Sequence, residues 1–415
     1  MHDTTALVPP PAQDYVPADN PRFVNLHRRF PTVLYLRRHA RRHVPRFAFE
    51  YMDGGASADG GIARNWCAFD AIELVPRYGV TTALPPVGVE LFGRRYSAPI
   101  GVAPMGGPSI VWPGADRHLA AAAQRARVPY VLGLVGGMTL ERAAEIAPDV
   151  LWFQLYRCSR NEHAIGFDLV RRAEAARVHV LVLTADVPVR TTRPREVAAG
   201  ITSPFRPDLR MLAGILTSPA YLRSLWRHGQ PRFGNLKPYT ADTANVDEVA
   251  AFVRREMGGA FTWEEVARYR ERWKGPLVVK GILHPADAET CVALGVDGLI
   301  VSNHGGRQIE ALPAAIDVLP AITRAVGGRA TVMLDSGVRS GLDVVRAVAL
   351  GADAAFAGKA FLWGLGALGA QGPLHVIDLM IEEMRSAVGQ FGAVRLNDLR
   401  KLDIRHENAI NFGTG

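Results

Sequence analysis

The chain has 415 residues, of which 48% are hydrophobic and 21% charged, and its formal net charge is +8 at pH 7. This composition excludes global disorder, because it can bury a large core. The positive charge suits an anionic ligand or an acidic membrane surface. We expect no nucleic-acid partner, since the sequence has no zinc-finger spacing and no basic stretch interleaved with aromatic residues.

Three cysteines, Cys67, Cys158 and Cys291, are too few and too scattered for a disulfide framework or a zinc site. We therefore expect a cytoplasmic protein without a bound metal. Residues 1–22 contain three consecutive prolines and no apolar core, which predicts a flexible lead-in rather than a signal peptide. We expect a single domain over residues 23–415 that begins with a helical segment.

Eight short β-rich runs recur along the chain, at residues 99–103, 130–134, 150–155, 178–184, 277–280, 298–302, 331–334 and 354–357. Most gaps between them show helical periodicity, for example at 116–127, 140–146, 169–176, 286–294 and 340–350. Continuous apolar strands that alternate with amphipathic helices indicate a parallel sheet covered on both faces. Eight such units favour an α/β fold of the (β/α)8 TIM-barrel type over an open doubly wound sheet.

The gap after the fourth run, about residues 187–275, is too long for an ordinary strand-to-helix connection and is interpreted as an insertion. Its segment 205–233 mixes large apolar residues with arginines, and Asp208 is its single acid. Such a segment can lie on an anionic membrane surface, here the inner face of the membrane. A lid over the active site or a subunit contact is an equally open alternative. The end of the insertion, where Glu265 follows Thr262 at capping-box spacing, predicts the start of a helix.

Barrel enzymes place their active-site residues at the C-terminal ends of the strands. After the sixth run comes the string SNHGGRQ at 302–308, in which His304 and Arg307 can present a base and a carboxylate ligand to one cavity. A buried histidine taken alone is as often a packed core residue. Polar residues also end four other runs, at 154–156, 184–186, 280–281 and 335–339. So many polar groups at one mouth indicate a catalytic site.

Together these strings resemble the FMN-dependent 2-hydroxy acid oxidases and dehydrogenases, the family of glycolate oxidase, lactate dehydrogenase and mandelate dehydrogenase. The resemblance spans about residues 40–400 and rests on FEYMDGGA at 49–56, WFQLY at 152–156, LTADVP at 183–188, VKG at 279–281 and the 302–308 string. The stretches 204–233 and 261–263 are most similar to the mandelate dehydrogenase branch. The resemblance implies FMN as cofactor, a small L-2-hydroxy acid (lactate- or mandelate-like) as substrate, and a homo-oligomer, specifically a tetramer.

The resemblance also implies catalytic roles. His304 would remove a proton from the substrate while the electrons pass to flavin N5, and Asp186 would pair with the imidazole. Tyr156 would contact the substrate hydroxyl or the oxo oxygen that forms. Arg193 and Arg307 would bind the substrate carboxylate, because a guanidinium fork matches that group.

Tyr51 would add a hydroxyl donor to the same carboxylate. Lys280 would lie beside flavin N1 and O2, where negative charge accumulates on reduction. The other positions implied in FMN binding are Pro104, Met105, Gly106, Gln154, Thr184, Ser302, Asp335, Gly337, Arg339, Gly358 and Lys359. Loops after the seventh and eighth strands commonly bind phosphate in barrels, which supports the last five independently. Several of these residues could instead serve structure alone, as a core aromatic, as surface charges or as partners of backbone groups.

Four positions depart from the family's pattern: Met105 replaces a threonine, Gly133 a serine, Thr191 a glycine and Lys359 an arginine. The first, second and fourth changes suggest altered affinity for FMN or altered flavin reactivity. The family's oxidases often carry alanine where Gly106 stands, so the glycine favours a dehydrogenase that passes electrons to a quinone or another carrier. An oxygen-using oxidase stays open, and so do an FMN-barrel isomerase and a non-catalytic flavin-binding protein.

Overall fold

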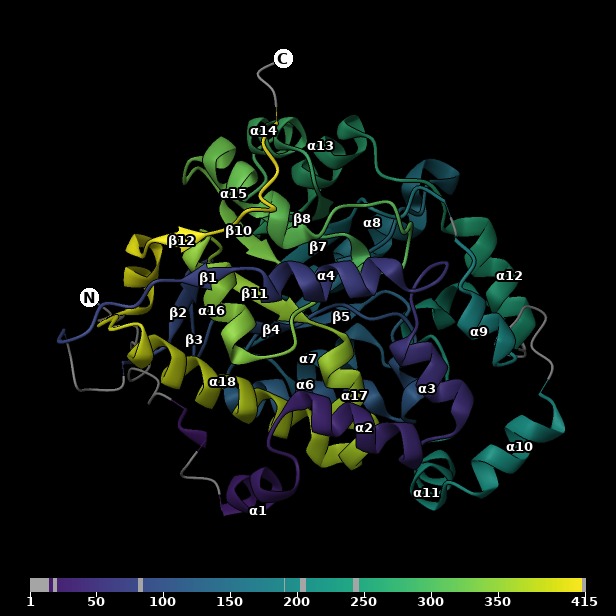
Figure 1. The fold of residues 1–415 in the computed structure, drawn as a ribbon. Helices are drawn as coiled ribbons and strands as arrows, with labels where there is room; N and C mark the ends of the chain where they lie inside the picture. The colour runs from purple at the N-terminus through teal and green to yellow at the C-terminus, as the bar shows by residue number, and fades with distance from the viewer. Residues whose placement is uncertain are drawn as a thin grey trace, which may run out of the picture.

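The computed structural model describes residues 15–17, 21–80, 85–189, 191–201, 207–241 and 246–412. Within these ranges, eight parallel strands close into a barrel in the order β10-β11-β4-β5-β6-β7-β8-β9, with helices around it (Figure 1). The strands are β4 (Ile100–Val102), β5 (Tyr130–Gly133), β6 (Leu151–Leu155), β7 (Val180–Thr184), β8 (Leu277–Ile282), β9 (Gly298–Val301), β10 (Thr331–Leu334) and β11 (Ala354–Ala357). The predicted (β/α)8 barrel is confirmed.

All eight predicted runs form barrel strands. Every residue of β6 and β7 is buried, because helices cover the outside of the sheet and side chains fill its inside. One strand extends beyond its predicted run: β8 continues past Lys280 to Ile282, with a register shift against β9 between these two residues. Gly281, at the shift, has a φ of +106°, a value that L side chains rarely adopt.

The helices that cover the barrel are α6 (Ala115–Ala126), α7 (Leu140–Ile146), α8 (Arg160–Ala175), α13 (Trp263–Arg272), α14 (Pro285–Ala293), α15 (Ala315–Val326), α16 (Gly341–Ala349), α17 (Lys359–Leu368) and α18 (Gly372–Gln390). Each of the five predicted helical stretches lies in or largely within one of them. The predicted capping box opens α13: Thr262 Oγ1 accepts from the Glu265 amide at 3.2 Å, and the Glu265 carboxylate accepts from the Thr262 amide at 3.0 Å.

The predicted N-terminal helical segment consists of α1 (Pro21–Arg29), α2 (Val33–His43), α3 (Arg46–Asp53) and α4 (Gly60–Asp70). Helix α2 packs on α17, and α3 packs on α5 (Pro108–Val111) and α9 (Pro194–Ala198), so this segment reaches the C-terminal ends of the strands. Two small antiparallel pairs lie outside the barrel, β2 (Val89–Leu91) with β3 (Arg94–Tyr96) and β1 (Glu73–Leu74) with β12 (Ile404–Arg405). Most of the predicted lead-in, 1–22, lies outside the described residues.

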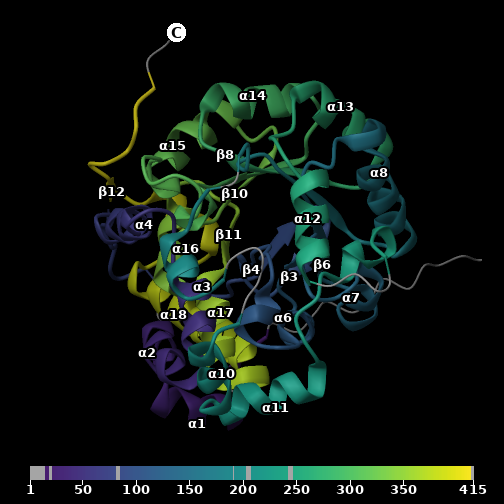
Figure 2. The ribbon, with the colours of Figure 1, turned by 90° about the vertical axis from the view of Figure 1, so that its right-hand side faces the viewer.

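After β7, the predicted insertion contains α9, α10 (Leu209–Leu216), α11 (Pro219–His228), the 3-10 helix η2 (Gly234–Tyr239) and α12 (Val246–Glu256). Pro219 occupies the first turn of α11, where the missing amide hydrogen costs nothing. Helices α10 and α11 lie at the periphery of the molecule in both ribbon views (Figure 1 and Figure 2).

Candidate active site

A cavity of about 660 Å³ lies at the C-terminal ends of the barrel strands. Fifteen of the eighteen predicted site residues line it: Tyr51, Pro104, Met105, Gly106, Tyr156, Thr184, Arg193, Lys280, His304, Arg307, Asp335, Gly337, Arg339, Gly358 and Lys359. The other three lie directly behind the lining, each bonded to a lining residue. Gln154 donates to Thr184 Oγ1 at 2.9 Å, Ser302 Oγ accepts from Lys280 at 2.7 Å, and Asp186 pairs with His304.

The His304 imidazole and the Asp186 carboxylate are in contact, with 2.9 Å between Nδ1 and Oδ1. His304 begins the 3-10 turn η3 (His304–Gly306) with a φ of +59°, an uncommon backbone conformation for a non-glycine residue. Ser336 Oγ holds this turn by accepting from the Asn303 and Gly305 amides at 3.1 and 2.9 Å. Burial opposes ionisation of Asp186, but His304 and the nearby Lys280 outweigh it and lower the pKa of Asp186 to about 2. Asp186 is therefore an anion that orients the imidazole.

Lys280 is a buried cation between two acids. Its Nζ lies 3.0 Å from Asp335 Oδ2 and 3.7 Å from Asp186 Oδ2. Burial opposes protonation of Lys280, but Asp186 and Asp335 raise its pKa above the usual lysine value. The next residue, Gly281, could not carry a side chain, because a Cβ there would lie 2.5 Å from the Cβ of Asp186. The glycine thus lets the β8 and β7 ends approach closely enough to pair Lys280 with Asp186.

Two tyrosines contribute protonated hydroxyls. Burial and the charge of Asp186 raise the pKa of Tyr156 to about 12. Burial also raises the pKa of Tyr51, with a smaller contribution from Glu196 and opposition from Arg307. The Tyr51 hydroxyl donates to the carbonyl oxygen of Gly106. Both side chains are therefore hydrogen-bond donors at neutral pH.

The two arginines predicted to bind a carboxylate lie side by side. Arg193 Nε donates to the carbonyl oxygen of Arg307 at 3.2 Å. Arg307 Nη1 donates to the carbonyl oxygens of Tyr51 and Gly54 at 2.9 and 2.8 Å. Both guanidinium groups also face the Glu196 carboxylate, a residue that the sequence analysis did not single out. Its only signal in the sequence is an acid that closely follows Arg193 in the insertion.

Two further basic side chains, Lys359 and Arg339, line the cavity where the phosphate is expected. Lys359 Nζ donates to the carbonyl oxygens of Met52, Asp53 and Gly54, at 3.1, 3.1 and 2.7 Å. Burial and the charge of Arg307 lower the pKa of Lys359 well below its usual value. An anion near this ammonium group would stabilise its protonated form.

Arg339 is held by two carboxylates, with Nη2 at 2.8 Å from Asp70 Oδ1 and Nε at 3.1 Å from Asp343 Oδ2. The adjoining Gly337 has a φ of +97°, and a Cβ there would lie 2.9 Å from the Asn65 side chain. At Gly337 the turn after β10 therefore presents backbone to the cavity.

The donor set fits FMN. The cavity has the size of a cofactor site, and its lining includes Lys280, Lys359 and Arg339, which supply the basic groups that an anionic ring edge and a phosphate require. Two departures from the family pattern are in contact: a Cβ at Gly133 would lie 2.9 Å from the carbonyl oxygen of Met105. Among the described residues, no group of three or more histidine, cysteine or acidic side chains could hold a metal.

Comparisons with known proteins identify the family. Residues 40–406 match the family of FMN-dependent dehydrogenases. The chain is 36% identical over 350 residues to an L-lactate dehydrogenase of Haemophilus influenzae (strain PittEE), covering 84% of this chain and 91% of that protein. It is 35% identical over 361 residues to an L-lactate dehydrogenase of Pectobacterium atrosepticum, covering 87% and 93%.

Solved structures agree as well. The monotopic membrane protein (S)-mandelate dehydrogenase matches with a TM-score of 0.85 at 32% identity, over 91% of this chain and 99% of that one. Mandelate oxidase with (S)-4-hydroxymandelic acid matches with a TM-score of 0.78, also at 32% identity and with the same coverage. The chain therefore belongs to the FMN-dependent dehydrogenase family, and the protein is an FMN-dependent 2-hydroxy acid dehydrogenase.

Proposed function

We propose that the protein oxidises an L-2-hydroxy acid with a small or aromatic apolar side chain, lactate- or mandelate-like, to the 2-oxo acid. One observation carries this proposal: a histidine oriented by a buried carboxylate shares a cavity with two adjacent arginines. Such a cavity suits a carboxylate next to a carbon that loses a proton and two electrons. An isomerase without net oxidation, or a protein that only binds flavin, does not require a base next to two carboxylate-binding arginines.

In the proposed reaction, Asp186 holds imidazole Nδ1, which leaves Nε2 of His304 to take a proton from the substrate's carbinol group. Bound FMN would accept the two electrons together with the second hydrogen that the oxidation releases. Arg193 and Arg307 bind and orient the carboxylate, and the hydroxyl of Tyr156 donates to a substrate oxygen. The single hydroxyl hydrogen of Tyr51 leaves the carbonyl oxygen of Gly106 in order to donate to the substrate carboxylate.

Lys280 would hold the ring of bound FMN with a fixed positive charge, which would stabilise the negative charge that the ring gains on reduction. Its two carboxylate partners and Ser302 hold the ammonium group in one place, so the charge needs no rearrangement during the reaction. Gln154 and Thr184 are proposed ring and ribityl contacts, and Lys359 and Arg339 are proposed phosphate ligands.

The outer part of the cavity supports an apolar substrate side chain. It is lined by Val189, Val197, Ile201, Val253 and Met257. Two of these remain open to solvent, because Val189 is 74% and Val197 50% exposed. A methyl or phenyl group that covers these side chains would gain the free energy of burying apolar surface.

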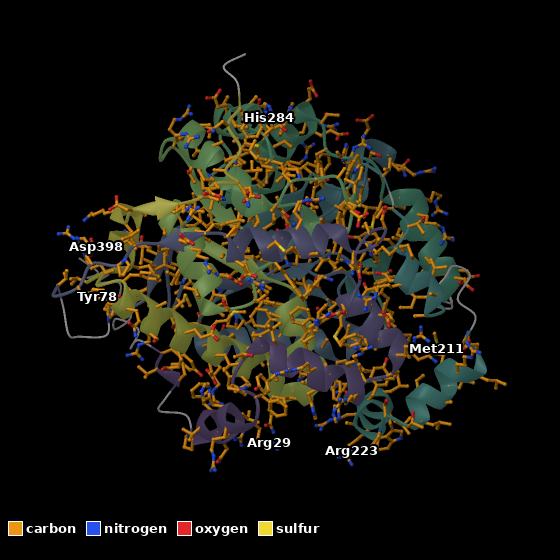
Figure 3. The ribbon with its side chains drawn as sticks, viewed as in Figure 1. Arg29, Tyr78, Met211, Arg223, His284 and Asp398 are labelled. Atoms are coloured by element: carbon orange, nitrogen blue, oxygen red, sulfur yellow. The ribbon has the colours of Figure 1, made fainter. Side chains whose placement is uncertain are left out.

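We further propose that the electron acceptor is a quinone or another carrier and that α10 and α11 contact an anionic membrane surface. Leu209, Leu216 and Trp226 are 84, 68 and 87% exposed, and exposed arginines lie beside them. Arg223 lies at the outer edge of the molecule (Figure 3). In the part of the chain that the structure describes, no helix is long and apolar enough to cross a membrane. The homo-oligomer and the domain boundaries stay predictions.

Anaerobic titration of the FMN-loaded protein tests the proposed reaction. L-lactate or (S)-mandelate should bleach the flavin absorbance, while the opposite enantiomers should not. Reoxidation is then followed with a quinone analogue or dye and, separately, with oxygen. Bound FMN that no 2-hydroxy acid bleaches would favour the isomerase or the flavin-binding protein, and faster reoxidation by oxygen would favour an oxidase.

A further inference from the structure

A carboxylate of the protein itself lies in the proposed carboxylate clamp, defined here as Arg193 and Arg307. Glu196 Oε1 lies 2.6 Å from Arg307 Nη2 and 3.4 Å from Arg193 Nη1. The exposed fractions of the three side chains are low, 12% for Glu196, 17% for Arg307 and 25% for Arg193. All three residues also line the cavity.

Other hydrogen bonds of the clamp already engage part of its N–H donors. Both bonds from Arg307 Nη1 go to backbone carbonyl oxygens, those of Tyr51 and Gly54. Arg193 Nε is bonded to the carbonyl oxygen of Arg307. The terminal nitrogen Nη2 of Arg307 has no backbone partner and can donate to a carboxylate, and Glu196 already accepts from it.

We infer that Glu196 is a resident competitor of the substrate: it occupies the carboxylate clamp when no substrate is bound and leaves it when a 2-hydroxy acid binds. This inference rests on the proposed function, because it takes Arg193 and Arg307 as the carboxylate ligands. Glu196 presents the same chemical group as the substrate. It neutralises one of two adjacent, largely buried cations, which would otherwise be left uncompensated.

Helix α9 is built so that the Glu196 side chain can turn away while the backbone stays. Arg195 anchors the helix through ion pairs with Glu50, Asp53 and Asp59, at 2.5, 3.0 and 2.7 Å. The next residue after Glu196, Val197, is half exposed, which places this helix at the cavity mouth. The proposed exchange requires the Glu196 carboxylate to rotate about its side-chain bonds from the clamp toward this mouth.

The exchange makes Glu196 a determinant of substrate specificity. A substrate carboxylate replaces one charge-assisted contact with another of the same kind. An analogue with a neutral amide in place of the carboxylate cannot offer the same exchange and should leave Glu196 in the clamp. The free energy with which the wild-type protein binds a small carboxylate is thus a difference: the free energy of placing that carboxylate in the clamp minus the free energy of placing Glu196 there.

Calorimetric titration of the FMN-loaded protein with oxalate tests the inference, because oxalate carries the carboxylate but cannot be oxidised by proton removal from carbon. Glu196→Gln should lower the Kd for oxalate by about tenfold, the scale of one charge-assisted hydrogen bond. Glu196→Asp, whose shorter side chain draws the carboxylate back, should also tighten oxalate. Glu310→Gln is the matched control, since Glu310 follows Arg307 by three residues and accepts from the Gly60 amide instead.

Salt separates direct competition from a general gain of positive charge. The gain from Glu196→Gln should persist at 0.5 M salt, where the Debye length is only about 4 Å, if the two carboxylates compete for one nitrogen. An unchanged or weaker oxalate affinity in Glu196→Gln, with an unchanged melting temperature, would show that Glu196 supports Arg307 rather than competing with substrate. A gain that vanishes at high salt, or that Glu310→Gln reproduces, also overturns the inference.

Parallel titrations of Arg193→Lys and Arg307→Lys distinguish failure of the inference from failure of the proposed function. Wild-type oxalate affinity in both lysine variants would place the carboxylate clamp elsewhere and would remove the inference with it. Weakened oxalate in the lysine variants together with unchanged oxalate in Glu196→Gln would overturn the inference alone.

Discussion

The ammonium group of Lys359 donates a 2.7 Å hydrogen bond to the carbonyl oxygen of Gly54. The same oxygen accepts from Arg307 at 2.8 Å. A cation from the proposed phosphate end and a cation from the carboxylate clamp thus meet at the C-terminal end of α3, the negative end of that helix. Lys359 therefore has a structural partner, the end of the helix that carries Tyr51, as well as a proposed ligand, the FMN phosphate.

Replacing Lys359 by arginine should tighten FMN binding by about 1 kcal/mol, roughly a fivefold lower Kd. A guanidinium group can bond the α3 carbonyl oxygens with one nitrogen and a phosphate with another. Lys359→Met is the control: it should weaken FMN and lower the melting temperature of the apoprotein, because the α3 carbonyl oxygens lose their donor. Fluorescence titration of apoprotein with FMN measures both variants. Unchanged or weaker FMN binding in Lys359→Arg would contradict the prediction.

His304→Gln should leave FMN bound but slow substrate-driven flavin reduction by at least about 10²–10⁴-fold, the usual contribution of a general base. Glutamine can still approach Asp186, so the loss reports the missing proton acceptor rather than a collapsed turn. Stopped-flow absorbance under anaerobic conditions gives the rate, and the FMN spectrum gives the occupancy. A variant that keeps more than a tenth of the wild-type reduction rate would disprove the assignment.

The barrel could be predicted because a strand that is buried on both faces is a continuous run of apolar residues, which can be recognised in the sequence. The bounds of β10 and β11 agree with the predicted runs, since each is apolar over its buried length. His304 could be found because it belongs to a string that follows such a strand. Glu196 could not, because its partner Arg307 is 111 residues away and no periodicity connects them. Side-chain pairs of this kind can be found only when the structure shows which loops meet at the C-terminal ends of the strands.

Arg193→Lys and Arg307→Lys should each raise the Kd for substrate by about ten- to a hundredfold and slow flavin reduction as well. An ammonium group is a point charge that cannot reproduce the planar fork, and a carboxylate that is poorly oriented lowers the fraction of productive complexes. Arg307→Lys also weakens the hydrogen bonds from this side chain to the carbonyl oxygens of Tyr51 and Gly54. The rate of reduction as a function of substrate concentration separates the two effects.

Asp186 should stabilise the fold at neutral pH and lose this contribution in acid. Its pKa is lowered from about 3.8 to about 2 by His304 and Lys280 against the opposing effect of burial. The stabilisation is fully present above about pH 5 and disappears as the pH falls through about 2, amounting to about 2 kcal/mol. Asp186→Asn lacks this dependence, so its difference from wild type in free energy of unfolding should shrink between pH 5 and pH 2. A constant difference would show that Asp186 has no lowered pKa.

The exposed faces of α10 and α11 predict binding to anionic vesicles. Leu209, Leu212 and Leu216 follow a three- and four-residue spacing along α10, so they share one face, and Leu222 and Trp226 share a face of α11. The opposite side packs on the protein: Met211 and Tyr221 are buried, and the Tyr221 hydroxyl donates to the carbonyl oxygen of Ile110 at 3.0 Å. Apart from Phe233, no described residue of the predicted segment 205–233 lines the cavity, which argues against a lid.

The expected behaviour is co-sedimentation with anionic vesicles at low salt and weaker binding as salt rises, because lipid phosphates attract the exposed arginines. Replacing Arg210, Arg223 and Arg227 by glutamine should abolish binding while dye-linked activity remains; Arg206, a fourth arginine of the predicted segment, lies outside the described residues. The control variant exchanges three surface arginines of α7, α8 and α13, which are Arg142, Arg171 and Arg268. Trp226→Ser should weaken binding even at low salt, since burial of a large apolar side chain contributes about 2 kcal/mol. A wild-type protein that stays in the supernatant at low salt would refute the membrane contact, and a change of oligomeric state in Trp226→Ser would identify the surface as a subunit interface.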